Sequence, residues 1–270
     1  MVARISAKLP KALFVLLIAA IVAFLLFPVF VVIPISFNDI NDLRFPPVGF
    51  SLRWYEAFMA DPFWRAAFLT SLQVALMTVV ASVSLGTAAA LALFMSDLRL
   101  KPALRLFLLS PLVTPVIVLA IGIFMVFSRW KLAGTITGLV VAHSVLAIPL
   151  VIVAVTAALH TIPPNLAMAS AGLGAGPVRT FFRITLPLLK PGVVAGAVFA
   201  FITSWDEAVI SIFLSSPSHR TLPVLIWSGV RTGLSPVIAA VGSILIIITA
   251  VGLALVYALR PADADNRQSL

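Results

Sequence analysis

The chain has 270 residues, of which 62% are hydrophobic and only 10% are charged, and it contains no Cys. A soluble domain is about 45–50% apolar and about 25% charged, so this chain lacks the polar side chains to cover a globule of its size. The composition excludes a soluble protein, and the absence of Cys excludes disulfides, thiolate metal sites and Cys nucleophiles.

Six apolar segments are long enough to cross a bilayer, because a spanning helix needs about 20 residues with few charges. Backbone polar groups inside lipid must be satisfied within the segment, so runs of this length predict helices. We expect an all-α integral membrane protein with six transmembrane helices that form one domain over residues 1–270. The predicted spans cover about residues 12–36, 68–94, 106–128, 134–159, 192–214 and 237–259.

The distribution of Lys and Arg predicts the orientation, because cytoplasmic loops carry an excess of these residues. With the N-terminus in the cytoplasm, eleven of the 18 basic residues lie on the cytoplasmic side. Both termini are therefore expected in the cytoplasm. Orientation and attraction to anionic headgroups explain much of the formal net charge of +9, and nucleic-acid binding is not expected.

Aromatic residues gather between the first two predicted spans. They are Trp54, Tyr55, Phe58, Phe63 and Trp64. They suit a helix that lies in the outer headgroup layer, where aromatic rings sit with one edge in water. The alternative is a surface on which an external partner docks.

A second long connection, residues 161–190, follows the fourth predicted span. The charge-free stretch from Leu132 to Val178 is long enough for two spans, but its second part holds three Pro and three Gly and few large apolar side chains. We expect a loop with a short helix there. Its small residues and the basic segment that follows favour a docking element, and an ordinary connecting loop is the alternative.

No catalytic motif is visible in the sequence. None of the five Lys lies in a Gly-rich phosphate-binding loop, and His143, His160 and His219 lack the spacing of metal ligands. No Gly-x-Ser-x-Gly nucleophile motif is present. We therefore expect no enzyme activity, no metal and no cofactor on this chain, and any ATP would be hydrolysed by another chain.

Asp206 and Glu207 are the only acidic residues within a predicted span. A carboxylate inside the membrane is costly and normally faces an aqueous pathway or a partner charge. With Trp205 beside them, the two acids could hold a cation by charge and by the face of the ring. The alternative is a packing role, with one acid neutral or paired with a basic residue of a neighbouring subunit. His143 is expected to hydrogen-bond a neighbouring helix.

The loop 161–190 resembles the EAA motif of permease subunits of ATP-binding-cassette (ABC) importers, in the spermidine/putrescine-type branch. Met168-Ala169-Ser170 precedes Gly174-Ala175, and Leu186-Pro187 completes the pattern, with Met168 where the motif has Glu. The resemblance extends over nearly the whole chain. Further strings that carry it are FPPVGFSLRWY (45–55), TSL (70–72), PLVTP (111–115), SWDE (204–207) and TLP (221–223).

The resemblance implies a type I ABC importer permease fold in which residues 161–190 form a cytoplasmic coupling loop. The residues that it assigns to contact with a cytosolic ATPase are Met168, Ala169, Ser170, Gly174, Ala175, Leu186 and Pro187. The implied partners are a homologous second permease, two cytosolic ATPase subunits that hold ATP and Mg²⁺, an external substrate-binding protein and membrane lipid. The implied location is the bacterial inner (plasma) membrane, which the chain crosses several times.

On this basis we expect import of a small cationic solute, with a polyamine such as spermidine or putrescine as the leading substrate. Trp205, Asp206 and Glu207 are the candidate substrate-pathway residues. Other amine-bearing solutes of the same importer class, such as opines and aminophosphonates, are alternatives. Two further alternatives remain. The chain is an ion-coupled secondary transporter, which would use the two acids as an ion site, or it is a scaffolding subunit without substrate contact.

Overall fold

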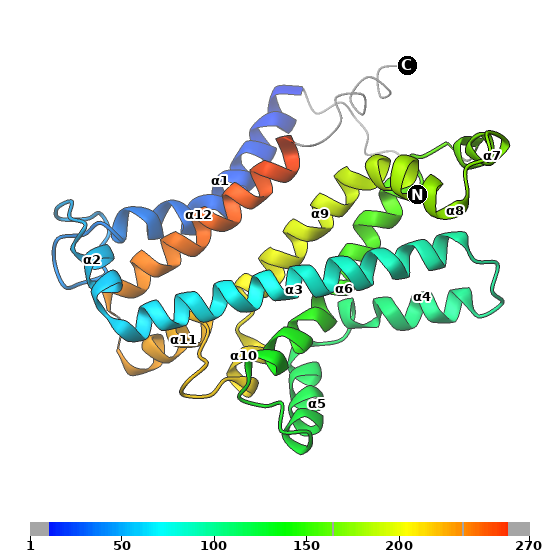
Figure 1. Ribbon diagram of the computed structural model, residues 1–270. Helices are drawn as coiled ribbons and strands as arrows, with labels where there is room; N and C mark the ends of the chain where they lie inside the picture. Colours follow the sequence, from blue (N-terminus) through cyan, green and yellow to red (C-terminus); the bar gives the residue numbers. More distant parts are fainter. Residues whose placement is uncertain (1–10, 164, 234, 259–270) are drawn as a thin grey trace, which may run out of the picture. The chain divides into compact units, whose positions relative to one another are not determined.

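The computed structural model describes residues 11–163, 165–233 and 235–258, which form helices joined by loops (Figure 1). Five helical stretches are long and apolar enough to cross a membrane. They are α1 (Lys11–Ile35), α3 (Pro62–Met95), α6 (Ile136–Leu159), the continuous stretch Pro177–Trp205 and α12 (Pro236–Ala258). The described residues therefore confirm an all-helical membrane protein, and a bent pair of helices brings the spanning segments to six if it counts as one.

This bent pair lies where the third span, 106–128, was predicted. α4 (Lys101–Leu109) continues through a 3-10 turn, η1 (Ser110–Leu112), and meets α5 (Val116–Arg129) at an angle of 100°. Pro115 explains the break, because proline has no N–H to donate and its ring disfavours a helical conformation in the residue before it. The segment is a broken span or a re-entrant loop instead of the straight helix that its hydrophobicity predicted.

The fifth predicted span, 192–214, is also interrupted. α9 (Leu186–Trp205) begins earlier than expected and ends before the two acids. After a non-helical segment, residues 206–208, the chain forms the short helix α10 (Val209–Leu214). Asp206 and Glu207 therefore lie at a break between two helices, and the prediction that a continuous helix contains them is wrong.

Shorter helices connect the long ones. The connection after α6 forms α7 (Asn165–Gly172), α8 (Pro177–Thr180) and a π-helical turn, η2 (Phe181–Thr185), which runs directly into α9. The short helix predicted in this loop is present. The remaining two helices are α2 (Arg53–Ala60) and α11 (Leu222–Thr232).

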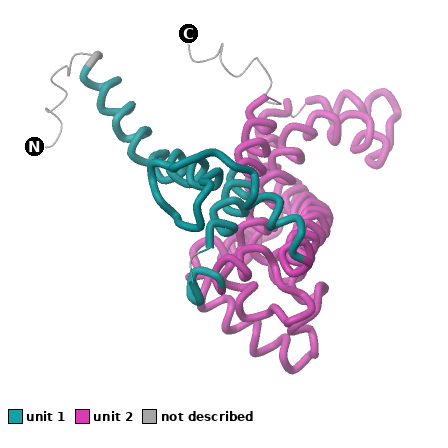
Figure 2. Tube along the Cα trace, turned by 90° about the vertical axis from the view of Figure 1, so that its left-hand side faces the viewer, with its two compact units in different colours: residues 1–61, 229–246 teal, residues 62–228, 247–270 magenta. Residues whose placement is uncertain are grey.

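The chain divides into two compact units (Figure 2). Unit 1 holds residues 1–61 and 229–246, and unit 2 holds residues 62–228 and 247–270. Unit 2 contains both the acidic break and the loop 161–190. The single domain over 1–270 that the sequence suggested stays a prediction.

In unit 1 the segment after α1 packs on itself around Asn38, which is fully buried. The side chain of Asn38 donates to the carbonyl of Asp42 and accepts from the N–H of Val48, each at 3.1 Å. Its carbonyl accepts a 2.6 Å hydrogen bond from Nε1 of Trp54 in α2. The helix predicted among the aromatic residues is thus present, but Trp54 and Phe58 are buried in the protein and do not face headgroups.

The core of unit 2 consists of α3, α6 and α9, which pack against one another. Val151 of α6 lies between Gly86 of α3 and Gly196 of α9. A Cβ atom at Gly86 would come within 2.8 Å of the Val151 side chain, and one at Gly196 within 3.2 Å. Glycine at these two positions lets both helices approach α6 closely, which makes α6 the central helix of the unit.

Candidate functional site

His143 of α6 ties together the two sides of the break between α9 and α10. Its Nδ1 lies 2.8 Å from Oγ of Ser204 near the end of α9, and its Nε2 lies 3.0 Å from Oγ of Ser211 in α10. All three side chains are buried. A buried polar group without a partner costs about 1–3 kcal/mol, so these two hydrogen bonds hold the break against α6. The prediction that His143 bonds to a neighbouring helix is confirmed.

Glu207 closes the break on the α10 side. Its Oε1 accepts a 2.9 Å hydrogen bond from the N–H of Ile210, in the first turn of α10. The first N–H groups of a helix have no partner within the helix, and a carboxylate there also complements the positive end of the helix dipole. Glu207 is partly buried and therefore has a structural role in this conformation.

Asp206 is the C-cap residue of α9, and its side chain is exposed. Its backbone N–H donates to the carbonyl of Ile202 at 3.2 Å, so the helical hydrogen bonds of α9 continue up to this residue. No basic side chain among the described residues forms an ion pair with Asp206. Of the two acids, Asp206 is therefore the one whose carboxylate is open to a ligand.

Trp205 is fully buried beside the two acids. Its ring stacks on Phe201, with centroids 5.5 Å apart, and meets the ring of Phe68 edge-on at 5.8 Å. Other rings thus surround the indole, and it does not present a face to a cation as the sequence suggested. In this conformation Trp205 positions the end of α9 by packing.

The loop 161–190, called the coupling loop after its predicted role, is closed by a hydrogen bond between two hydroxyl groups. Oγ of Ser170 in α7 lies 2.8 Å from Oγ1 of Thr180, the last residue of α8. The N–H of Ala175 donates to the carbonyl of Ser170 at 3.1 Å. Gly174 turns the chain with a φ of +78°, in the left-handed region that only glycine adopts readily. These contacts make α7 and α8 one compact turn.

Apolar side chains are exposed on the α7 side of this loop. Leu173 is 89% exposed and Met168 is 69% exposed, and Ala169 is exposed beside Met168. Exposed apolar side chains of this kind suit contact with another protein or with lipid. We use the name apolar face of the coupling loop for three side chains, those of Met168, Ala169 and Leu173.

The seven residues assigned to ATPase contact thus fall into three groups. Met168 and Ala169 lie on the apolar face, whereas Ser170, Gly174 and Ala175 shape the turn beneath it. The last two, Leu186 and Pro187, begin α9 after the π-helical turn. The motif therefore combines residues that a partner can touch with residues that hold the loop in shape.

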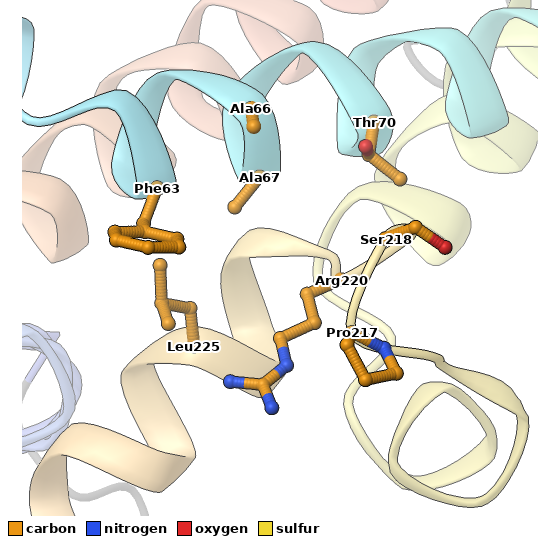
Figure 3. A pocket seen from close by; sticks show the side chains of 8 residues that line it. All are labelled: Phe63, Ala66, Ala67, Thr70, Pro217, Ser218, Arg220 and Leu225. Atoms are coloured by element: carbon orange, nitrogen blue, oxygen red, sulfur yellow. The ribbon is translucent and has the colours of Figure 1, made fainter.

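A cavity of about 360 Å³ lies at the start of α3 (Figure 3). It is lined by residues of α3 from Phe63 to Thr70 and by residues near α11 from Pro217 to Leu225. Arg220 is the one charged side chain in its lining, so the cavity does not suit a cation. No pattern in the sequence indicates this cavity, although the string TLP at residues 221–223 lies next to it.

The partners of His143 could not be predicted from the sequence either. Ser204 and Ser211 are 61 and 68 residues away, and no spacing rule connects them to a histidine in another span. Among the described residues, no three His, Asp or Glu side chains lie together as a metal site would require. The candidate site therefore consists of the break with its open Asp206 carboxylate and the apolar face of the coupling loop.

Known proteins resemble this chain in sequence and in fold. Residues 82–262 match a family described as binding-protein-dependent transport system inner membrane component. The chain is 31% identical over 232 residues to the spermidine/putrescine transport system permease protein PotC of Escherichia coli (strain K12), a match that covers 86% of this chain and 88% of PotC. It is 30% identical over 230 residues to the putrescine transport system permease protein PotI of the same strain, covering 83% of this chain and 82% of PotI.

A solved structure shares the fold. It is a bacterial ABC transporter involved in the import of the acidic polysaccharide alginate, with a TM-score of 0.66, 14% sequence identity and coverage of 92% of this chain and 94% of that chain. At this identity the likeness shows the fold alone, which is the type I ABC importer permease fold. The chain is a multi-pass transport subunit and belongs to the family of binding-protein-dependent transport system inner membrane components.

Proposed function

We propose that this permease imports a small cationic amine, with a polyamine of the spermidine/putrescine class as the leading substrate, across the bacterial inner membrane. The observation that carries the proposal is the exposed Asp206 carboxylate, which lies at the end of a spanning helix and forms no ion pair with a described basic residue. The relatives PotC and PotI are named for spermidine/putrescine and putrescine transport and support this substrate class.

The charge of Asp206 explains why a cationic substrate suits the site. A carboxylate at membrane depth costs about 2.5–3.5 kcal/mol on insertion scales, so such groups face water or a counter-charge. The ammonium group of an amine supplies a positive charge and up to three N–H donors. Because Asp206 has no ion-pair partner among the described residues, a passing ammonium group needs to displace only water there.

The neighbours of Asp206 have supporting roles in this proposal. Glu207 adds negative charge beside Asp206 while its carboxylate caps α10 through Ile210. Trp205 holds the end of α9 in place among aromatic rings. The direct contact with substrate is therefore assigned to Asp206.

The same proposal includes partner subunits. A homologous second permease would complete the pathway, two ATPase subunits would bind ATP and Mg²⁺, and an external protein would deliver the substrate. The apolar face of the coupling loop supports the ATPase contact, because Leu173 and Met168 are large apolar side chains left exposed. Rigid movement of the helices that follow the loop would then alternate access to the pathway.

Uptake by the assembled transporter in proteoliposomes tests the substrate proposal. Asp206→Asn removes the charge and keeps the shape of the side chain, so we expect the KM for spermidine and putrescine to rise by about tenfold or more, since a hydrogen bond to a charged group contributes about 1.5–3 kcal/mol. Asp97→Asn, an exposed carboxylate between α3 and α4, is the matched control and should leave the KM unchanged.

Three results would contradict the proposal. An unchanged KM in Asp206→Asn would remove this residue from the pathway. Uptake that persists without ATP but requires an ion gradient would favour an ion-coupled transporter. Saturable uptake of an opine or aminophosphonate, with no uptake of polyamines, would assign the importer to another amine.

A further inference from the structure

A second cavity, of about 430 Å³, lies between the end of α3, α4 and the end of α6. It opens at the end of unit 2 that carries the coupling loop, because α6 ends at Leu159 and α7 begins at Asn165. Cavities of this size hold small organic ligands. Neither the acidic break nor the apolar face of the coupling loop contributes to its lining.

The lining changes from polar to apolar along both α4 and α6. On α4 the side chains that line the cavity are Lys101, Arg105 and Leu109, which follow one another at intervals of one helical turn. On α6, in the opposite chain direction, His160 and Thr156 are followed by Ile152. The cationic and polar groups thus gather at the coupling-loop end, and aliphatic groups line the part about 12 Å further into the helices.

The positive charges of the cavity have no acidic partner. The lining contains no carboxylate, and neither Lys101 nor Arg105 forms an ion pair with a described residue. Nζ of Lys101 donates to the carbonyls of Ser96 and Phe94, at 3.0 Å and 3.5 Å, which holds the ammonium group at the end of α3. The guanidinium of Arg105 is exposed and can form two parallel hydrogen bonds to a phosphate.

We propose that this cavity binds an anionic phospholipid of the leaflet at the coupling-loop end. The phosphate and headgroup would lie at Lys101 and Arg105, and an acyl chain would run along Leu109 and Ile152. Basic pockets between spanning helices recognise anionic headgroups in this way. Charge complementarity selects an anionic headgroup, and the aliphatic inner part selects a lipid over a free phosphate ion, which would leave that part unfilled.

Native mass spectrometry of the full-length chain and of the assembled transporter, with added phosphatidylglycerol or phosphatidylcholine, tests the proposal. We expect retention of phosphatidylglycerol and little retention of phosphatidylcholine. Arg105→Gln should weaken phosphatidylglycerol binding about fivefold, because a basic residue near an anionic surface contributes about 1 kcal/mol. Arg99→Gln removes the same charge from the exposed turn before α4, outside the cavity, and should leave binding unchanged.

A second variant separates a lipid from a phosphate ion. Val153 lies beside Ile152 in the cavity lining and is exposed, so Val153→Phe fills the aliphatic part and keeps every charge. We expect this variant to bind phosphatidylglycerol more weakly. The ability of inorganic phosphate to compete with the lipid headgroup should stay unchanged. Equal loss in Arg105→Gln and Arg99→Gln, or full binding in Val153→Phe, would overturn the proposal. If the isolated chain retained lipid but the assembled transporter did not, a partner subunit would fill the cavity in the assembly. This result would also overturn the proposal.

Discussion

The break between α9 and α10 and the coupling loop differ in what their side chains touch, although both lie in unit 2. At the break, the side chain of His143 is buried and is hydrogen-bonded within the chain by Ser204 and Ser211. On the coupling loop, large apolar groups such as Leu173 stay exposed. The break is therefore positioned by contacts within the chain, whereas the exposed side chains of the loop are predicted to contact another protein.

The largest effect is expected where the break is held to α6. His143→Ala removes two buried hydrogen bonds and leaves a cavity, so we expect the free energy of unfolding to fall by about 2–3 kcal/mol. Thermal unfolding of the purified chain in detergent measures the change. His160→Ala removes an exposed histidine from the end of the same helix and is the control. Equal melting temperatures for the two variants would show that the break does not depend on His143.

A change on the apolar face should affect partner binding and leave the fold intact. Leu173→Asp places a charge where an apolar contact is expected, so we predict that affinity for the ATPase subunit falls about tenfold or more. The free energy of unfolding should change by less than about 0.5 kcal/mol, because the side chain is exposed. Binding of the ATPase subunit to the reconstituted permease measures the affinity.

The matched variant for this measurement is Val48→Asp, which adds the same charge at an exposed apolar side chain of unit 1. It should bind the ATPase subunit as the unchanged protein does. Full ATPase affinity in Leu173→Asp would exclude the apolar face as the docking surface.

The smallest effect is expected within the turn of the loop. Gly174→Ala forces a side chain into the left-handed region at a φ of +78°, which costs about 1 kcal/mol, although the space around it is open. Gly176→Ala is the control, because Gly176 has a φ of −68° and equally open space. Amide hydrogen exchange should become about fivefold faster at residues 170–175 in the first variant alone. The same exchange rate in both variants would contradict a role for the turn conformation.

The sequence predicted the long helices better than their interruptions. α1, α3, α6 and α12 follow from apolar runs that are long enough to span and end at charged or Pro-rich segments. The breaks at Pro115 and Asp206 lie within runs of similar hydrophobicity, where composition cannot separate a continuous helix from a broken one. Hydrophobicity indicates that a segment lies in the membrane but does not determine how its backbone bends there.

The candidate site shows the same limit. Asp206 stood out because acids are rare inside spans, and the coupling loop stood out by its small residues and its motif. The division of roles did not follow from the sequence, since Glu207 caps α10 through Ile210 and Trp205 packs among rings from two helices. These roles depend on where α9 ends, which is set by tertiary contacts such as that between His143 and Ser204.

The π-helical turn joins the coupling loop to α9 without a gap, so that Pro177–Trp205 is one helical stretch of 29 residues. At 1.5 Å per residue this stretch is a rod about 43 Å long. A tilt of about 10° around one end would displace the other end by about 7 Å. We predict that a displacement of the loop would move the end of α9 next to Asp206, and that bending at η2 would absorb part of this movement.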